Sequence, residues 1–218
     1  MRVCVIGGSR EADQLCAQLK RPFRIDGDDV PEEIDADCVI DASHPCEPVT
    51  PKQVAAICDA QALPYLRVRR AAWEPLAEDA WLSVVDSVEA AQVLQPDWQR
   101  VFLCLGEVDR APFSDDDGRW YLVRTSQWPA GNLPPHHALT AKDGPFLVEQ
   151  EINLMRHHKI DVLVTRNAGG KGAVPKVSAA RAIGLPVIML ERPESPGPEV
   201  ATIRKALAWV GSLARQSS

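Results

Sequence analysis

Short apolar runs alternate with amphipathic stretches along most of the chain. Runs such as Val162–Thr165 and Val187–Leu190 are apolar without a two-residue alternation. Strands of a parallel sheet are buried on both faces and have this pattern. The pattern predicts ten strands: Val3–Ile6, Phe23–Ile25, Cys38–Ile40, Tyr65–Val68, Trp81–Val85, Val101–Leu105, Trp120–Val123, Ala138–Thr140, Val162–Thr165 and Val187–Leu190.

Helical periodicity fills several of the intervals between these strands. Ser9 is a candidate N-cap for a helix over 10–19, and Pro51 suits the first turn of a helix over 51–60. Further helices are expected over 146–157, 176–183 and 199–213. The order is therefore that of repeated strand-helix-strand units.

Five strands in each half favour an α/β protein with two Rossmann-like, doubly wound parallel-sheet domains. The turn Gln95-Pro96-Asp97 suggests a nucleotide-binding domain over 1–97 and a second domain over 98–218. The proline-rich stretch 128–135 is an alternative linker, interpreted here as a loop of the second domain.

Composition narrows the class of protein. The net charge of −6 argues against a nucleic-acid partner. Apolar runs are far shorter than the ~20 residues of a membrane span, and the start of the chain has no secretory signal pattern, so a cytoplasmic protein is expected. Six cysteines without metal-ligand spacing predict free thiols and no metal site.

Ligands of open α/β sheets bind beyond the carboxyl ends of the strands, so the loops there are the places to search. The first, Gly7-Gly8-Ser9-Arg10, turns from a strand into a helix. Glycines and the amides of a helix start allow a phosphate to approach, and Arg10 adds a positive charge. A plain tight turn is the alternative, because the full GxGxxG pattern is missing.

Two further loops of the first half carry polar groups. Asp41-Ala42-Ser43-His44-Pro45 follows a buried strand, and its side chains suit a ribose and phosphates or, alternatively, cap their own backbone. Arg67, Arg69 and Arg70 lie at the end of another strand, where they suit a phosphate or form a solvated edge.

Loops of the second half are also distinctive. They include Gly106, the segment Asp143-Gly144-Pro145-Phe146, and the glycine-rich stretch 165–172 followed by Lys176. The glycine-rich stretch lacks the residue order of a Walker motif, which argues against a nucleotide triphosphatase.

Taken in order, these loops resemble the precorrin-6A reductase family. The first half contributes Gly7–Ala12, Asp41–Pro45, Leu63–Arg67 and Trp73; the second contributes Phe102–Gly106, Gly144–Phe146 with Glu149 and Glu151, Asp161–Thr165, Asn167–Gly170, Lys176 with Ala179–Arg181, and Gly184–Pro193. The resemblance extends over roughly Arg2–Pro193.

The resemblance implies reduction of one double bond of the precorrin-6A macrocycle, metal-free or cobalt-bearing, to give precorrin-6B in cobalamin biosynthesis. It implies a hydride from NADPH or, in cobalt-containing pathways, NADH. It also implies two Rossmann-like domains, with the tetrapyrrole in the cleft between them. A monomer or weak homodimer without nucleic-acid or membrane partners is expected.

Residue roles are predicted on the same basis. The expected cofactor contacts are Gly7, Gly8, Ser9, Arg10, Asp41, Ala42, Ser43, His44, Pro45 and Arg67. The expected substrate contacts are Gly106, Gly144, Pro145, Phe146, Asn167, Gly169, Gly170 and Lys176. Candidates for donating the proton to the reduced double bond are His44, Asp143 and Lys176.

The sequence departs from the family pattern at Glu107, commonly arginine or lysine, and at Ala168, commonly serine. A positive charge and a hydroxyl that would meet substrate carboxylates are missing. These departures leave two alternatives open: a reductase of another substrate, and a catalytically silent nucleotide-binding or sensor module.

Overall fold

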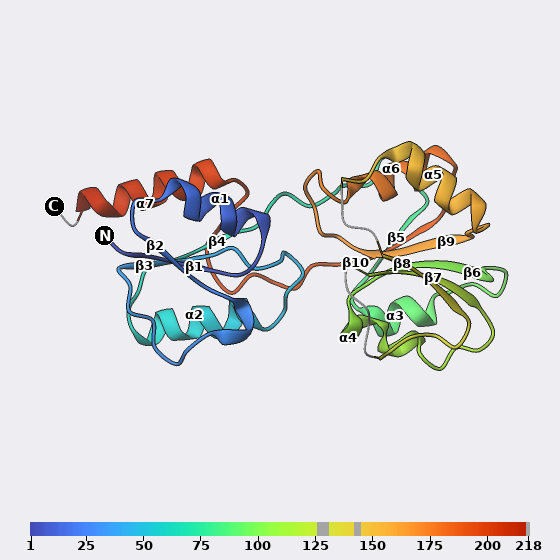
Figure 1. Ribbon diagram of the computed structural model, residues 1–218, viewed down its shortest axis with the longest axis horizontal. Helices are drawn as coiled ribbons and strands as arrows, with labels where there is room; N and C mark the ends of the chain where they lie inside the picture. Colours follow the sequence, from blue (N-terminus) through green and yellow to red (C-terminus); the bar gives the residue numbers. More distant parts are fainter. Residues whose placement is uncertain (126–130, 142–144, 217–218) are drawn as a thin grey trace. The chain divides into compact units, whose positions relative to one another are not determined.

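Two compact units make up the protein, a computed structural model of which describes residues 1–125, 131–141 and 145–216. The first unit combines Met1–Ala71 with Pro193–Ser218, and the second is Ala72–Arg192. Both units contain a sheet covered by helices (Figure 1). Every strand pairing in the two sheets is parallel, which confirms the predicted α/β fold class.

The first unit contains a five-stranded sheet of order β11-β4-β3-β1-β2. Its strands are β1 (Val3–Ile6), β2 (Pro22–Ile25), β3 (Cys38–Asp41), β4 (Tyr65–Val68) and β11 (Glu199–Val200). Its helices are α1 (Arg10–Gln18), the 3-10 turn η1 (Gly27–Asp29), α2 (Thr50–Ala60) and α7 (Ile203–Gln216). Helices α1 and α7 cover one face, and α2 covers the other (Figure 1).

The second unit contains a six-stranded sheet of order β5-β10-β9-β6-β7-β8. Its strands are β5 (Trp81–Val84), β6 (Arg100–Cys104), β7 (Trp120–Thr125), β8 (His137–Ala141), β9 (Val162–Arg166) and β10 (Val187–Leu190). Its helices are α3 (Ser87–Gln92), α4 (Glu107–Arg110), η2 (Ala111–Phe113), α5 (Val148–His157) and α6 (Val174–Ala182). Helices α5 and α6 share one face (Figure 1).

The division between the units differs from the expected one at residue 97. Strand β5 pairs with β10, residue Val187 lying opposite Trp81, so the chain has already entered the second sheet at residue 81. The end of the chain returns to the first unit, where Ala206 packs in the core beside Leu66 and Val68. Proximity in sequence therefore does not determine which sheet these segments join.

The segment 199–213 was predicted as one helix, and its first residues are a strand instead. Glu199 and Val200 pair in parallel with Arg67 and Val68 at the edge of the first sheet. Helix α7 begins only at Ile203, where the Thr202 hydroxyl accepts a hydrogen bond from the Lys205 amide. Unpaired backbone groups on the edge of β4 favour the strand over the helix.

Both sheets have a topological switch point, where the chain leaves neighbouring strands in opposite directions. In the first unit the neighbours are β1 and β3, and in the second they are β6 and β9. Ligands of doubly wound folds bind outside the carboxyl ends of such a strand pair. The loops after β1, β3, β6 and β9 are therefore the candidate site loops.

Candidate functional site

The glycine turn after β1 is fixed by backbone contacts at its first glycine. Gly7 has a φ of +106°, and a Cβ there would lie 2.8 Å from Ser43 Cα. At Gly8 the nearest atom to such a Cβ is the Arg24 Nη2, at 3.2 Å, and the residue is exposed. Gly7 is thus required by the fold, whereas Gly8 leaves room for a ligand beside the turn.

Ser9 is the N-cap of α1, as predicted, and it also connects this turn to the next loop. Its Oγ accepts a hydrogen bond from the Ala12 amide at 3.2 Å and donates one to the Ala42 carbonyl at 2.5 Å. Arg10 follows, exposed on the first turn of α1. The amides at the start of a nine-residue helix, with its dipole, make this end favourable for an anion.

A buried network holds the loop after β3. Asp41 accepts hydrogen bonds from the Ser43 amide at 2.8 Å and from the Tyr65 hydroxyl at 2.9 Å, and its Oδ2 lies 3.5 Å from the Arg67 Nε. Burial and the neighbouring Asp41 carboxylate raise the pKa of Tyr65. Asp41 and Arg67 are both fully buried.

Arg67 of β4 and Arg69, just after this strand, also donate hydrogen bonds to carbonyl groups of this loop. The Arg67 Nη2 donates to the His44 carbonyl at 3.2 Å, and the Arg69 Nε donates to the Pro45 carbonyl at 3.1 Å. Arg69 also donates to the carbonyl of Pro193, where the chain returns to this unit. Both side chains are buried and paired with each other, which does not favour direct contact with a ligand. Contact of Asp41 or Arg67 with a dinucleotide stays a prediction.

Two side chains of the loop have properties that suit a ligand. The Ser43 hydroxyl is buried and, within the described residues, has no hydrogen-bond partner. His44 is exposed, and its Nδ1 accepts a hydrogen bond from the Cys46 amide at 3.2 Å. This bond places the proton of neutral His44 on Nε2.

In the second unit, the loop after β6 is open around Gly106. Nothing in the described residues lies within 4 Å of a Cβ built there. Helix α4, which follows it, is fixed by an ion pair between Asp109 and Arg166, and Arg110 donates to the Leu105 carbonyl at 3.1 Å. Register places Cys104 of β6 opposite Thr165 of β9, so the loops carrying Gly106 and Asn167 are neighbours.

The glycine-rich loop after β9 is clamped onto Trp73. Asn167 accepts a hydrogen bond from the Trp73 amide and donates one to the Trp73 carbonyl, both at 2.9 Å. The Trp73 indole donates to the Gly170 carbonyl at 2.7 Å. Gly169 and Gly170 both have a φ of +67°, which favours glycine.

Lys176 lies against the same ring. Its Nζ is 5.4 Å from the Trp73 ring centroid, and its side chain is buried. A hollow of about 280 Å³ beside this assembly is lined by Trp73, Trp81, Asn167 and Arg192, among others. The structure therefore brings the predicted Asn167, Gly170 and Lys176 together around a tryptophan that had not been assigned a role.

Phe146, a predicted substrate contact, lies against the ion pair between Arg124 and Glu151. Arg124 forms two hydrogen bonds with the buried Glu151, at 2.9 and 3.0 Å, and its guanidinium lies 4.7 Å from the Phe146 ring centroid. Pro145 precedes this ring on the approach to α5. Asp143 and Gly144 lie outside the described residues.

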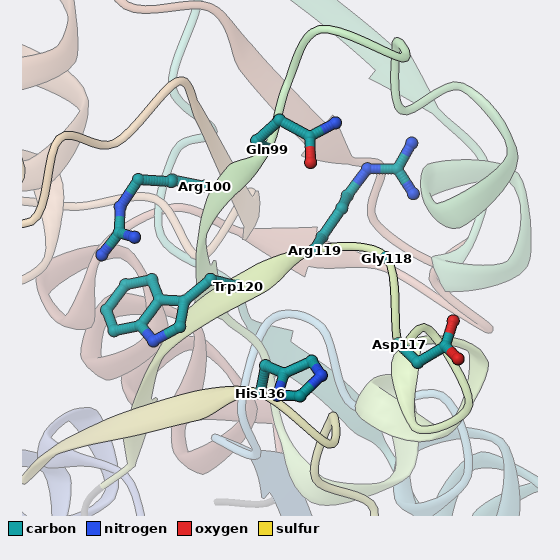
Figure 2. Close-up of a pocket in the computed structure, with 7 residues that line it drawn as sticks. All are labelled: Gln99, Arg100, Asp117, Gly118, Arg119, Trp120 and His136. Atoms are coloured by element: carbon teal, nitrogen blue, oxygen red, sulfur yellow. The ribbon is translucent and has the colours of Figure 1, made fainter.

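A larger hollow, of about 430 Å³, lies at the amino-terminal ends of β6, β7 and β8. Figure 2 shows Arg100 and Trp120 side by side at the starts of β6 and β7, with His136 just ahead of β8. The guanidinium of Arg100 lies 3.9 Å from the Trp120 ring centroid. This hollow is remote from the switch point, so the smaller one beside Trp73 is the better candidate for the substrate.

The described residues also show the state of the thiols and the absence of a metal cluster or membrane-spanning helix among them. All six cysteines are free, and burial raises the pKa of Cys4 to about 12 and of Cys38 to about 11. In residues 1–125, 131–141 and 145–216, no group of three His, Cys, Asp or Glu side chains is placed to hold a metal ion. Among those residues, no helix has the length and apolar character to cross a membrane.

The two parallel sheets, each with a switch point, define a two-unit α/β protein of the doubly wound, Rossmann-like class. The sequence pattern of the family described as "Precorrin-6x reductase CbiJ/CobK" matches residues 28–211. The chain belongs to this family, as the resemblance had indicated.

Similar proteins agree with this assignment. The chain is 38% identical to a precorrin-6A reductase of Rhodococcus erythropolis over 83% of this chain and 73% of the relative. It is 37% identical to that of Mycobacterium tuberculosis over 84% and 74%. A solved structure titled "CobK precorrin-6A reductase" covers 98% of this chain and 97% of its own, with a TM-score of 0.86 at 29% identity.

Proposed function

We propose that this chain reduces precorrin-6A to precorrin-6B in cobalamin biosynthesis, using a reduced nicotinamide dinucleotide. The observation that carries the proposal is family membership over residues 28–211, joined to relatives that are named precorrin-6A reductase. These findings do not favour the silent-module alternative. The expectations of a cytoplasmic protein, monomeric or weakly dimeric, without nucleic-acid or membrane partners, belong to the same proposal.

The first unit fits the dinucleotide. Gly8 is exposed beside the start of α1, and the Ser43 hydroxyl is a buried polar group in need of a partner. The turn from Gly7 to Arg10 would hold the phosphates, and Ala42, Ser43, His44 and Pro45 would line the remainder. When bound, the nicotinamide supplies the hydride for the double bond.

Asp41, Arg67 and Arg69 act on this site as positioning residues. Their hydrogen bonds fix the carbonyls of His44 and Pro45 and the amide of Ser43. Fixed loop groups bind a ligand without an ordering cost at the moment of binding. Arg10 and Arg67 are positive charges that suit the additional phosphate of NADPH, and only Arg10 of these two is exposed.

A proton must reach the carbon next to the one that accepts the hydride. His44 is the candidate in the first unit, since its ring is exposed on the loop after β3; donation requires the imidazolium form, in which Nδ1 no longer accepts from the Cys46 amide. Lys176 is the second candidate, and Asp143 the third. Glutamine in place of His44 keeps a hydrogen-bond donor but has no ionisable proton. The pH profile of turnover in His44→Gln therefore separates a proton donor from a merely structural residue.

The substrate side of the proposal rests on the second unit. Gly106 leaves open space, and Asn167 lines the hollow beside Trp73. Gly170, which follows Gly169 in the same loop, accepts a hydrogen bond from the Trp73 indole, and Lys176 lies against the Trp73 ring. We assign Lys176 to a carboxylate of the macrocycle, with Pro145 and Phe146 as apolar contacts. Lys176→Ala is expected to raise the KM for precorrin-6A about tenfold or more; unchanged affinity and turnover would remove this assignment.

The experiment that tests the proposal is anaerobic incubation of the purified protein with precorrin-6A and either NADPH or NADH. The visible spectrum of the macrocycle and oxidation of the nicotinamide are followed together. Equal loss of both substrates is expected. Dinucleotide binding without turnover would point instead to another substrate or to a silent module.

A further inference from the structure

The hollow at the amino-terminal ends of β6, β7 and β8 has no part in the proposed function. Its volume of about 430 Å³ lies in the range of small-molecule pockets, roughly 300–1,000 Å³. Arg100 begins β6, and Gly106 follows the other end of that strand. At ~3.3 Å per residue, the hollow is therefore about 20 Å from the loop that carries Gly106. A molecule in this hollow leaves the proposed substrate site free.

The guanidinium of Arg100 is fixed in the wall of this hollow. It lies 3.9 Å from the Trp120 ring centroid, and its Nε donates a hydrogen bond to the His158 carbonyl. The His158 ring in turn stacks on Trp120, with centroids 5.5 Å apart and planes at 17°. Because stacking and the Nε bond hold the planar group, its two terminal nitrogens keep a fixed orientation.

The two terminal nitrogens of Arg100 have no partner in the fold. Within the part of the chain that the structure describes, neither donates a hydrogen bond or forms an ion pair. Arg119, the other arginine of the lining, is instead paired with Asp116 at 2.8 Å. Burial, with the charges of His157 and Arg100, lowers the pKa of His158, so that ring is neutral at pH 7. Arg100 is thus the uncompensated positive charge on this side of the hollow.

The one acidic side chain that lines the hollow, Asp117, lies away from Arg100. Figure 2 shows Asp117 on the far side of the hollow, with the rings of Trp120 and His136 between the two charges. Both rings line the hollow, and His136 is exposed. The Arg100 side therefore attracts an anion, and the two rings offer it flat apolar surface.

We propose that this hollow is an additional ligand site, which takes a small organic oxyanion with a planar apolar body. The carboxylate or phosphate of the ligand accepts hydrogen bonds from both terminal nitrogens of Arg100. Its planar body lies against Trp120 and His136. Because the guanidinium is already held, binding carries little ordering cost for this side chain.

Titration of the full-length ¹⁵N-labelled protein, followed by NMR, tests the site without cofactor or macrocycle. The probes are benzoate and phenyl phosphate, with neutral benzamide as the control of the same planar body. The signals followed include the indole N–H of Trp120 and the amide of Gly118. The variants are Arg100→Gln, Arg100→Lys and the matched control Arg156→Gln. Arg156 is exposed on α5 in the same unit and does not line the hollow, so its loss removes an equal charge.

At least one of the two acids is expected to produce saturable shifts centred on Trp120, with a dissociation constant in the millimolar range, as for other fragments of this size. The tighter acid identifies the oxyanion as carboxylate or phosphate. Benzamide and Arg100→Gln should each weaken binding about tenfold or more, because the charge-assisted hydrogen bonds are lost. Arg100→Lys should also weaken it, since an ammonium lacks the planar fork, and Arg156→Gln should behave as wild type.

Three outcomes overturn the inference. Shifts that do not saturate, or that weaken equally in Arg156→Gln, would show non-specific attraction to the surface. Benzamide binding as tightly as benzoate and phenyl phosphate would remove the oxyanion from the site. Saturable shifts located away from Trp120 in wild type would place the ligand elsewhere, even if the Arg100 variants failed to fold. Failure of the proposed reductase would leave these results unchanged, because the titration contains neither of its substrates.

Discussion

The two units hold their switch-point loops by different means. In the first, a buried ion pair and two arginines grip the backbone of the loop after β3. In the second, Trp73 anchors the glycine-rich loop after β9 through both its backbone and its indole. The first arrangement leaves a narrow turn suited to phosphates, and the second leaves a hollow of about 280 Å³ with an indole in its wall. Under the proposed function, one fold class therefore binds two kinds of ligand through the groups that fix its loops.

The largest effect is expected from breaking the ion pair of the first unit. Asp41→Ala leaves the Arg67 guanidinium buried without its charge partner, which typically costs about 3–5 kcal/mol. Urea denaturation followed by circular dichroism measures the change in the unfolding free energy of the first unit. Asp41→Ala combined with Arg67→Met should recover much of the loss, since no buried charge remains. A loss below about 1 kcal/mol for Asp41→Ala would contradict a bracing role.

The corresponding change in the second unit is Trp73→Ala. It removes the indole bond to Gly170 and the ring beside Lys176, while the Asn167 bonds to the Trp73 backbone can persist. We expect a loss of about 2 kcal/mol in stability and a higher KM for precorrin-6A. Trp73→Phe is the matched variant, because it retains a ring and loses only the N–H donor. If both variants left the KM unchanged, the hollow beside Trp73 would not be the substrate site.

The glycine turn offers a sharper contrast within one loop. Gly8→Val should weaken dinucleotide binding about tenfold or more, or about 1.4 kcal/mol, without unfolding the protein. Only the flexible end of Arg24 lies near the new Cβ. Gly7→Ala should instead lower stability, because it meets the backbone of Ser43 at a φ of +106°. Unaltered affinity in Gly8→Val, measured by fluorescence titration, would move the dinucleotide elsewhere.

The smallest effect is expected at a peripheral ion pair of the second unit. Two hydrogen bonds from Arg181 hold the pKa of the Asp79 carboxyl below its usual value, helped by the Leu76 amide. A lowered pKa contributes stability above the unfolded-state pKa, near 4, and the contribution disappears as the pH falls through the folded-state value. Asp79→Asn should therefore cost about 1 kcal/mol at pH 7 and less at pH 3. An equal cost at both pH values would exclude this linkage.

Local pattern was sufficient for most of the fold, because strands buried on both faces have distinctive sequences. The predicted bounds of Val3–Ile6, Tyr65–Val68 and Val187–Leu190 are confirmed. Glu199 and Val200 were missed as a strand because two residues carry no periodicity, and their pairing depends on a distant edge. Assigning Trp81–Val84 to the second sheet likewise required contacts that no local window contains.

The candidate site was less predictable than the fold. Loop positions after strands indicated where Gly8, Ser43 and Asn167 would lie, since that depends only on the topology. Burial of Arg67 was not predictable, because an arginine at a strand end has the same local sequence whether it meets solvent or a carboxylate. Trp73 had two usable signals: its place in the family resemblance, and its being a lone large aromatic within the irregular stretch Ala71-Ala72-Trp73-Glu74-Pro75.

The return of the chain to its first unit has a consequence for synthesis. During translation residues 1–71 leave the ribosome before the second unit, yet the strand and helix that complete their sheet and core follow that unit, within residues 193–218. The second unit is continuous in sequence and complete by residue 192. Domains commonly fold in the order of their synthesis. The edge of β4 on the side of β11 therefore stays open until residues 199–200 have left the ribosome, after the whole second unit.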